Sequence, residues 1–325
     1  MSGWRNTGMQ HEVRGVITRE PSDILNALSA GRLPLDSPAV PKGVFMVEPV
    51  NFRLSEDSAR DNQYMDMAAE VDADRALEQY LELVQLIRHA GVTVKSFTGH
   101  SVTPEDVFPN NVFGTAPAYF RRPGRLIIGR MLHESRRKEA ERQDVRNYFS
   151  AMGYEIVDLS GEDCVAELTG PLVIDRGRRL GFCGMSSRVD ETGLTAMNQA
   201  FDLRHTLQFE LAPGEYHTNV ILSVLASRAC VVQTEAIVDP RVKRALAVIY
   251  DEKVLHLDRS EKQAFAGNCI ALTPNDVFMS QTAADGLRPQ NRALLEYWGF
   301  RIHSVALDEI EKAGGSLRCM VAEIY

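Results

Sequence analysis

The sequence predicts an α/β protein, because short strand-like runs alternate with amphipathic helices along most of the chain. Each run contains about four to eight residues with β-branched or aromatic content, and Gly, Pro or Asn bounds it. No Gly/Ser-rich linker divides residues 44–325, so these units predict one α/β domain. The runs are GVFMVEPV, EDVFPNNVFGT, AELTGPLVID, EYHTNVILSVLA, GNCIALTP and SLRCMVAEIY.

Four helices are expected between these runs. The stretch from Asp72 to Ala90 shows the spacing of an amphipathic helix, and its predicted apolar face consists of Leu77, Tyr80, Leu81, Val84 and Ile87. The other three are expected over Ser135 to Ser150, Pro240 to Ile249 and Gln290 to Trp298.

Residues 1–42 are predicted to be an N-terminal extension rather than a domain. The end of this segment, SAGRLPLDSPAVPKG, is rich in Pro, Ser and Gly, as connecting segments usually are. Residues 43–325 then form the single folded domain.

Composition narrows the possible functions. Of the 325 residues, 44% are hydrophobic and 25% are charged, so a sizeable core can form. The net charge of −8 argues against a general nucleic-acid binder, which needs a basic face. No run approaches 18 apolar residues, and the N-terminus lacks the apolar region of a signal peptide. We therefore expect a cytoplasmic protein that binds neither nucleic acid nor membrane.

The five cysteines suit a reducing compartment, because their number is odd and none forms a C-x-x-C pair. Cys and His residues are not clustered at metal-binding spacings, and no Rossmann or P-loop motif is present. We therefore expect neither a metal nor a cofactor. Four cysteines lie among apolar neighbours and are predicted to be small buried side chains: Cys164, Cys183, Cys230 and Cys269.

The C-terminal segment AGGSLRCMVAEIY carries the fifth cysteine. Two glycines predict a tight turn directly before a strand that holds Arg318 and Cys319. A guanidinium beside a thiol favours the thiolate, which is the attacking species in cysteine catalysis. The residues alone equally allow a buried core cysteine on the last strand.

Three other segments place polar side chains next to apolar strands. His217, in GEYHTNV, can shuttle a proton, although a single histidine is more often structural. Glu167, in AELTGP, either caps a turn or faces a site. Asn110 and Asn111, in VFPNNVF, are costly to bury without partners, and an ordinary Asn-Asn turn is the alternative.

Together, these segments resemble the pentein, or guanidino-group-modifying, superfamily. It includes arginine deiminases, dimethylargininases, amidinotransferases and citrulline hydrolases, and the sequence is most similar to the arginine-deiminase-related branch that contains citrulline hydrolases. The similarity covers roughly residues 44–325, and its motifs occur in the family order: VFPNN (107–111), ELTGPLVIDR (167–176), SSR (186–188), YHTNV (216–220), GNCIAL (267–272) and GGSLRCM (314–320).

The resemblance implies a five-bladed α/β propeller of ββαβ modules with its site in the central channel. Cys319 resembles the nucleophile that attacks the central carbon of a guanidino or ureido group. His217 resembles the acid that protonates the departing nitrogen and then the base for water. Glu167 is similar to the carboxylate that grips substrate nitrogens. Arg188 is expected to bind the substrate α-carboxylate, whose planar shape a guanidinium matches, and Arg318 is a second candidate.

Two departures from arginine deiminases suggest the substrate. Asn111 and Asn219 stand where those enzymes carry aspartates that would pair with a cationic guanidinium. Amides offer both donors and acceptors, as a neutral ureido group requires. Asn110, Asn111 and Asn219 are therefore predicted to bind substrate, and citrulline hydrolysis to ornithine, carbon dioxide and ammonia is the predicted reaction.

Several alternatives remain open at this point. The first is an arginine or methylarginine hydrolase, since Glu167 could serve a guanidinium alone. The second is an amidinotransferase, in which an amine resolves the intermediate. The third is a propeller that binds an amino acid without catalysis. A homodimer is expected from the general frequency of dimers among soluble enzymes.

Overall fold

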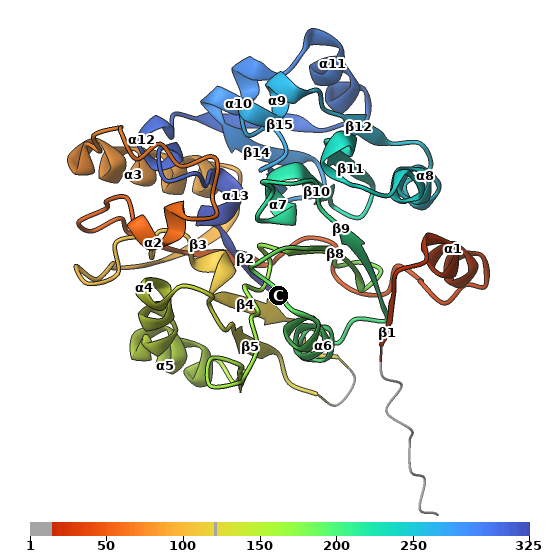
Figure 1. The fold of residues 1–325 in the computed structure, drawn as a ribbon, viewed down its shortest axis with the longest axis horizontal. Coiled ribbons are helices and arrows are strands. Elements are labelled where there is room, and N and C mark those ends of the chain that lie inside the picture. Colours follow the sequence, from red (N-terminus) through yellow and green to blue (C-terminus); the bar gives the residue numbers. More distant parts are fainter. Residues whose placement is uncertain (1–14, 120–121) are drawn as a thin grey trace, which may run out of the picture.

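The computed structural model describes residues 15–119 and 122–325, and these residues form five small sheets around a common centre (Figure 1). In every sheet, a middle strand pairs antiparallel with an inner strand and parallel with an outer strand. A helix connects the middle strand to the outer strand, as a parallel crossover requires. The chain is therefore a five-bladed α/β propeller of ββαβ modules, as predicted.

The elements of the modules fall into four sets. The inner strands are β4 (Phe113–Ala116), β7 (Leu172–Asp175), β10 (Leu222–Leu225), β13 (Ile270–Ala271) and β16 (Ala322–Ile324). The middle strands are β5 (Arg125–Ile128), β8 (Leu180–Met185), β11 (Ala229–Val232), β14 (Asp276–Ser280) and β2 (Gly43–Val47). The outer strands are β6 (Glu155–Asp158), β9 (His205–Glu210), β12 (Val254–His256), β15 (Arg301–Val305) and β3 (Thr93–Phe97). The connecting helices are α5 (Gln143–Ala151), α6 (Glu191–Ala200), α8 (Pro240–Ile249), α11 (Pro289–Tyr297) and α3 (Ala73–His89).

Shorter elements lie in the connections. Besides three short turns that are described with the site, they are β1 (Val16–Thr18), α1 (Pro21–Ser29), α2 (Glu56–Ala59), α4 (Glu134–Arg137), η2 (Lys138–Glu141), η3 (Thr234–Ala236), α9 (Arg259–Gln263), α10 (Gln281–Gly286) and α12 (Asp308–Glu311).

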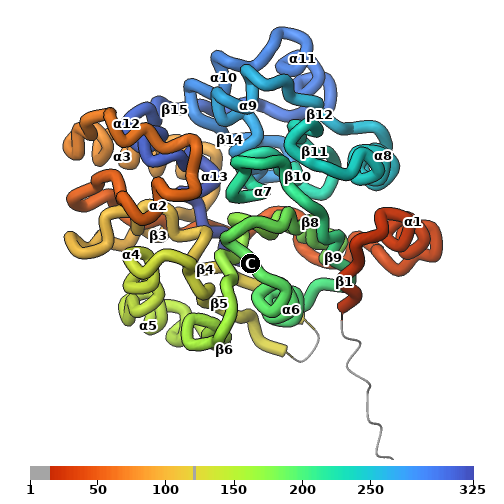
Figure 2. The backbone as a smooth tube through the Cα atoms, in the orientation of Figure 1, coloured from red at the N-terminus to blue at the C-terminus, as the bar shows by residue number. Residues whose placement is uncertain are grey.

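The last strand of the chain lies in one sheet with two early strands. The last strand, β16, pairs antiparallel with the early strand β2, and Ala322 lies opposite Phe45. Figure 2 shows the C-terminus at the centre of the ring. This pairing closes the ring and holds the segment before β16, which contains Cys319, at the centre.

Three of the four predicted helices form at the expected positions, but one predicted face is only partly right. Helix α3 begins after Asp72, whose side chain caps it, and buries Ala76, Tyr80 and Leu83. Leu77 and Leu81 were predicted to lie on the buried face, but they are 36% and 48% exposed. The buried face is thus rotated from the predicted one.

The single helix predicted over residues 135–150 is wrong. The chain forms α4, η2 and α5 instead, because Arg142 adopts an extended conformation between η2 and α5. Its buried guanidinium bonds to Asp106, Asp144 and the carbonyl of Thr98, and these bonds hold the break.

The predicted extension contributes to the propeller over its described part. Strand β1 pairs parallel with β9, and α1 packs against α8 through Ile24 and Ala27, which are fully buried. The first 14 residues of the predicted extension lie outside the described residues.

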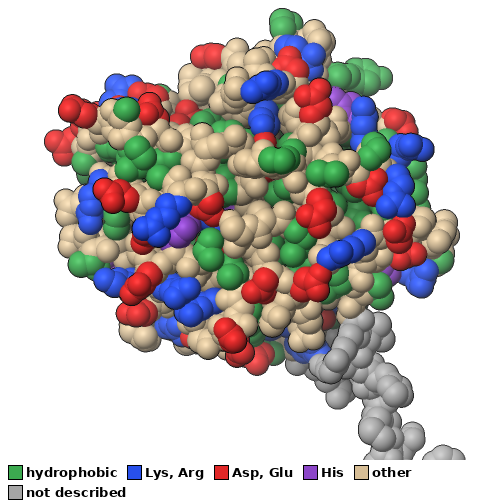
Figure 3. Space-filling model, in the orientation of Figure 1, with side chains coloured by type: hydrophobic (Ala, Val, Ile, Leu, Met, Phe, Trp, Pro, Cys, Tyr) green, Lys and Arg blue, Asp and Glu red, His purple; other side chains and the backbone are tan. Residues whose placement is uncertain are grey.

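Figure 3 shows acidic and basic side chains interspersed over one face of the molecule. No helix among the described residues is both long and apolar enough to cross a bilayer.

Candidate active site

Three short helical turns hold or directly follow several of the predicted site residues near the centre of the ring. They are η1 (Pro109–Asn111), α7 (Thr218–Ile221) and α13 (Leu317–Met320), and each directly precedes an inner strand. The prediction that Cys319 lies on a strand is wrong. The backbone N–H of Cys319 donates to the carbonyl of Ser316 at 2.9 Å and closes a helical turn, and the strand begins only at Ala322.

Hydrogen bonds join the corresponding turns of neighbouring modules around the ring. Thr169 Oγ1 donates to the carbonyl of Asn110 at 3.0 Å, and Asn219 Nδ2 donates to the carbonyl of Thr169 at 3.0 Å. Asn268 Nδ2 donates to the carbonyl of Asn219 at 3.0 Å and also lies 3.4 Å from Cys319 Sγ. The ring therefore determines the position of the thiol.

A cavity with about 290 Å³ of empty space lies on one side of this ring. Cys319 and His217 both line it, so the predicted nucleophile and proton shuttle share one chamber. The other lining residues are Ser58, Asn62, Glu105, Phe108, Asn111, Arg136, Arg188, Tyr216, Ala313 and Gly315.

His217 and Glu167 form a fully buried pair. His217 Nε2 lies 2.9 Å from Glu167 Oε2, and both side chains are 0% exposed. Burial acts to raise the pKa of Glu167, but the charge of Arg188 and the hydrogen bond with His217 outweigh it. The pKa of Glu167 therefore lies well below its ordinary value, and Glu167 is a carboxylate that orients the imidazole.

Glu167 has protein partners for both oxygens. Oε2 accepts from Arg188 Nη1 at 3.1 Å as well as bonding to His217, and Oε1 accepts from the backbone N–H of Leu132 at 3.1 Å. Glu167 is not among the residues that line the cavity. Its predicted role in gripping substrate nitrogens stays a prediction.

Arg188 connects this pair to the segment after α2. Its Nε and Nη2 donate to the two oxygens of Asp61 at 2.8 and 2.6 Å. Nη2 also reaches the carbonyl of Ser58 at 3.4 Å. Most donors of Arg188 are thus engaged by protein groups, and its predicted binding of the substrate α-carboxylate stays a prediction.

The thiol and the imidazole both favour their neutral forms. Burial raises the pKa of Cys319, and the hydrogen bond from Asn268 opposes it only in part. Burial likewise lowers the pKa of His217, against the opposing effect of Glu167. The resting site therefore holds a thiol and a neutral imidazole near neutral pH, and the thiolate forms when its proton is removed.

Arg318 lies apart from the cavity that the thiol lines. Its guanidinium donates to the carbonyl of Val321 at 2.9 Å and to Glu323 at 3.0 Å. It lines a different cavity, on the side of the inner strands, together with Arg176 and Glu323. Its side chain is therefore not brought together with His217, and a role in substrate binding stays a prediction.

The predicted amides differ in position. Asn111 lines the cavity, whereas Asn110 and Asn219 are absent from its lining. The Oδ1 atoms of Asn110 and Asn111 are buried without a hydrogen-bond partner among the described residues. Asn219 Oδ1 lies 4.0 Å from Cys319 Sγ. Asn111 thus presents an unpaired acceptor beside the cavity.

The sequence interpretation missed several residues of the site. Asn268 lies in the motif GNCIAL, which the resemblance singled out, but its contact with the thiol depends on the ring closing. Arg136 lines the cavity, and its Nε and Nη2 bond to Glu139 at 2.9 and 2.7 Å. Tyr216 lies in the motif YHTNV, but no role was assigned to it. Asp61 lacked a signal, because its partner Arg188 is remote in sequence.

Gly170 makes room for the imidazole of His217. A Cβ at this position would lie 2.7 Å from Cε1 and Nε2 of His217, closer than real Cβ contacts. The glycine of the ELTGP motif therefore permits the imidazole to lie beside the turn.

The described residues contain no group of three or more His, Cys, Asp or Glu side chains placed to hold a metal ion.

The ring of five modules and the Cys–His–Glu arrangement at its centre define the protein class, the pentein enzymes that modify guanidino groups. Within this class, the chain belongs to the family described as N,N dimethylarginine dimethylhydrolase, eukaryotic, which matches residues 48–325.

Known relatives support this assignment. The bifunctional arginine dihydrolase/ornithine cyclodeaminase AgrE of Nostoc sp. is 25% identical over 254 residues, which are 77% of this chain and 33% of AgrE. The chain therefore spans about a third of the length of that relative. An uncharacterized protein of Aeropyrum pernix is 26% identical over 261 residues, which are 79% of this chain and 87% of that protein.

Solved structures share the fold. The N-terminal domain of the cyanobacterial arginine dihydrolase ArgZ, in covalent complex with a reaction intermediate, is 20% identical and has a TM-score of 0.73, with coverage of 87% of this chain and 97% of that one. A dimethylarginine dimethylaminohydrolase adduct with S-methyl-L-thiocitrulline is 19% identical and has a TM-score of 0.65, with coverage of 87% and 100%.

Proposed function

We propose that this chain is a cysteine-dependent hydrolase that cleaves a carbon–nitrogen bond in the ureido group of an arginine-like amino acid. The specific reaction is citrulline plus water to ornithine, carbon dioxide and ammonia. The observation that carries the proposal is the unpaired, buried Oδ1 of Asn111 beside the cavity that Cys319 and His217 line. An amide oxygen accepts a hydrogen bond from a neutral ureido N–H without a carboxylate's charge.

The charges around the cavity favour a neutral reacting group. Glu105 is the one carboxyl among the described lining residues, and it accepts a hydrogen bond from Ser58 at 2.6 Å. Burial raises the pKa of Glu105 against the charge of Arg136. Two guanidinium groups, those of Arg136 and Arg188, line the same cavity. A cationic substrate group would meet little uncompensated negative charge there.

Arg136 is our candidate for the substrate α-carboxylate. Its Nε and Nη2 donate to the carboxylate of Glu139, and Nη2 also donates to the backbone carbonyls of Glu105 and Phe108, but its Nη1 has no hydrogen-bond partner among the described residues. Since Arg136 lines the cavity, this nitrogen can donate to a carboxylate there. Arg188 has fewer free donors and instead supports Glu167.

The proposed reaction proceeds through a covalent intermediate. The Cys319 proton passes to His217 as the sulfur attacks the ureido carbon, and His217 returns it to the first nitrogen, which leaves and gives a thiocarbamate on Cys319. His217 then takes a proton from water, which attacks the same carbon. The Cys319 thiolate leaves and takes that proton, and the released carbamate loses carbon dioxide and frees the second nitrogen. Glu167 keeps the imidazole oriented in both steps.

A second candidate is hydrolysis of arginine itself. The name of AgrE describes an arginine dihydrolase, and a dihydrolase must also cleave a ureido group after its first step. Glu105 would then be the carboxyl available to the guanidinium.

Three further properties belong to the proposal. They are a cytoplasmic location, a homodimer, and the assignment of residues 1–42 to an N-terminal extension.

The test is incubation of the purified protein with L-citrulline, L-arginine or N,N-dimethylarginine, with ornithine, citrulline and ammonia as products to measure. We expect ornithine and ammonia from citrulline and no turnover by Cys319→Ala. Asn111→Asp should shift the preference toward arginine, because it adds a negative charge to the pocket. Turnover of arginine with citrulline inert would overturn the ureido proposal but keep Cys319 as nucleophile.

A further inference from the structure

A second pocket, partly open to solvent, lies between the module of β4–β6 and the module of β7–β9. Its empty space of about 350 Å³ includes the solvent at its mouth, and it adjoins the ends of β4 and β7 that lie farthest from the catalytic turns. It shares no lining residue with the cavity of Cys319. The lining residues are Ser37, Ala116, Pro117, Tyr119, Arg125, Ile174, Arg176, Arg179, Phe201, Asp202 and Leu203.

Two of the three arginines in this pocket have carboxylate partners. Arg179 Nη2 lies 2.6 Å from Asp202 Oδ2, and Arg179 also bonds to the carbonyl of Asp202. Arg176 bonds to Glu323 at 3.3 Å and to the carbonyl of Thr115 at 2.9 Å. These two guanidinium groups are therefore already satisfied by the protein.

Arg125 is the exception. Its side chain is 8% exposed, yet no carboxylate of the described chain lies within 4.0 Å of its guanidinium. Nη1 reaches the carbonyl of Gln199 only at 3.4 Å, and the buried Nε has no partner among the described residues. The charge of Asp202 acts on Arg125 only from beyond contact distance. A buried guanidinium with no carboxylate in contact is costly, so this geometry favours an anion beside it.

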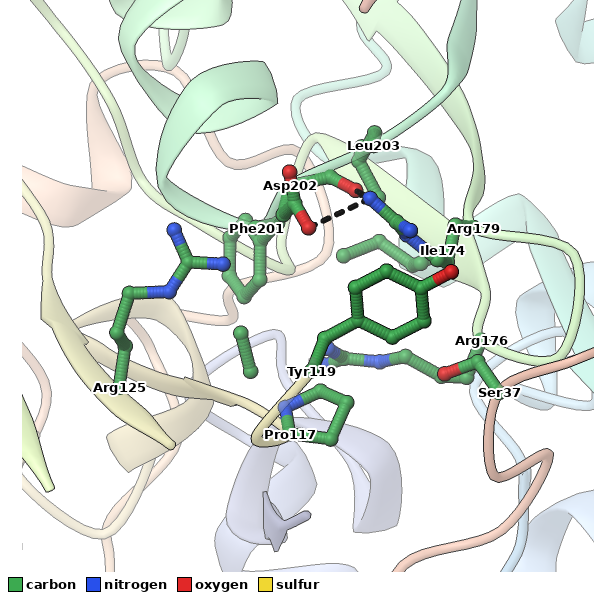
Figure 4. A pocket seen from close by; sticks show the side chains of 11 residues that line it. Ser37, Pro117, Tyr119, Arg125, Ile174, Arg176, Arg179, Phe201, Asp202 and Leu203 are labelled. Atoms are coloured by element: carbon green, nitrogen blue, oxygen red, sulfur yellow. Dashed lines mark hydrogen bonds and ion pairs between the residues drawn. The ribbon is translucent and has the colours of Figure 1, made fainter. Parts of the chain in front are cut away.

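The remaining walls of the pocket are mostly apolar. Figure 4 shows the Arg125 guanidinium beside the ring of Phe201, with the Arg179–Asp202 pair and the ring of Tyr119 farther around the pocket. Ile174 and Leu203 complete the apolar surface. A small, strongly hydrated inorganic anion would leave these walls uncovered, whereas an organic anion would pack against them.

We propose that this pocket binds a small organic carboxylate, which pairs with Arg125 and packs its apolar body against Phe201 and Ile174. A planar carboxylate matches the guanidinium fork with two parallel hydrogen bonds. The site is independent of the proposed hydrolysis, because none of its residues lines the catalytic cavity.

The test uses the full chain and benzoate as the probe, with inorganic phosphate and chloride at equal ionic strength as comparison anions. Isothermal titration and thermal unfolding should show saturable benzoate binding and a rise in Tm. Arg125→Met should weaken benzoate binding at least tenfold. Cys319→Ala should retain binding, and so should Arg241→Gln, which changes an exposed arginine on α8.

The Tm values measured without benzoate separate an effect on binding from an effect on folding. Arg125→Met should have a Tm at or above that of the wild type, because it removes an unpaired buried charge. Arg125→Gln serves as a second variant that keeps hydrogen-bonding capacity without the charge. The absence of benzoate binding to the wild type, equal binding of phosphate, or unchanged benzoate binding by both Arg125 variants would each overturn the proposal.

Discussion

His217 Nε2 lies 2.9 Å from Glu167 Oε2 in a position that solvent does not reach. Arg188 bonds to the same carboxylate oxygen and, through its other nitrogens, to Asp61. The imidazole is therefore the inner end of a chain of contacts that runs outward to the segment after α2. Each link of this chain can be tested separately.

The space around the imidazole can be tested at Gly170. We expect Gly170→Ala to displace His217, because the added Cβ would lie 2.7 Å from two ring atoms. Overpacking of this kind typically costs about 1–3 kcal/mol of stability, and turnover should fall much more steeply than stability. Gly161→Ala is the matched control, since a Cβ there has no atom within 4 Å. Normal activity of Gly170→Ala would contradict the assigned position of the imidazole.

The buried charges can be tested at Glu167. Glu167→Gln should abolish most turnover and lower the free energy of unfolding, measured by urea denaturation at pH 7. Removing one partner of a buried ion pair costs about 3–5 kcal/mol. A loss near the lower end of this range is expected, because Arg188 keeps its ion pair with Asp61.

A double-mutant cycle provides the control for this effect. Arg188→Met added to Glu167→Gln should cost less than the sum of the two single changes, by about 0.5–3 kcal/mol. Strict additivity would mean that the two side chains do not interact in solution.

The environment of the thiol can be tested at Asn268. Asn268→Ala should raise the pKa of Cys319 further, because it removes the hydrogen bond that opposes burial. The measurement is the pH dependence of Cys319 alkylation by iodoacetamide, in which only the thiolate reacts. The alkylation profile should move to higher pH than in the wild type.

Ser223→Ala is the matched control for that experiment. Ser223 bonds to the carbonyls of Gly267 and Cys269 in the same turn, but no hydrogen bond joins it to the thiol. It should alter stability without moving the alkylation profile. Equal shifts in both variants would indicate a general loosening of the turn rather than a direct effect on the thiol.

The ion pair between Arg188 and Asp61 predicts that the stability of the protein depends on pH. Burial acts to raise the pKa of Asp61, but hydrogen bonds from Arg188 and Ser187 outweigh it and hold that pKa well below 3.8. A depressed pKa contributes stability above the unfolded value and loses it as the pH falls through the folded value. The wild type should therefore exceed Asp61→Asn in stability by a constant amount above pH ~5.

That difference should shrink as the pH falls below 3.8, because the folded wild type begins to take up the proton that the unfolded chain already binds. Urea denaturation of both proteins at several pH values between 7 and 3 provides the measurement. A difference that is unchanged at the lowest pH would show that the ion pair with Arg188 does not contribute.

The sequence alone was enough to predict the fold class, the propeller and the meeting of Cys319 with His217. The alternation of strand-like runs and helices predicted the α/β class, because local periodicity reports which face of each element is buried. The order of six motifs predicted the propeller, which the sheets confirm. The same motifs predicted that Cys319 and His217 would meet, and they line one cavity.

Other features were decided only by the tertiary structure. The helical turns that hold Cys319 and His217 follow apolar patterns that local propensity reads as strand, and contacts with neighbouring modules override that propensity. Asn268 reaches the thiol, and Asp61 reaches Arg188, across gaps of 51 and 127 residues. Hydrogen bonds between remote segments leave no periodic signal in a sequence, because they exist only once closure of the ring brings those segments together.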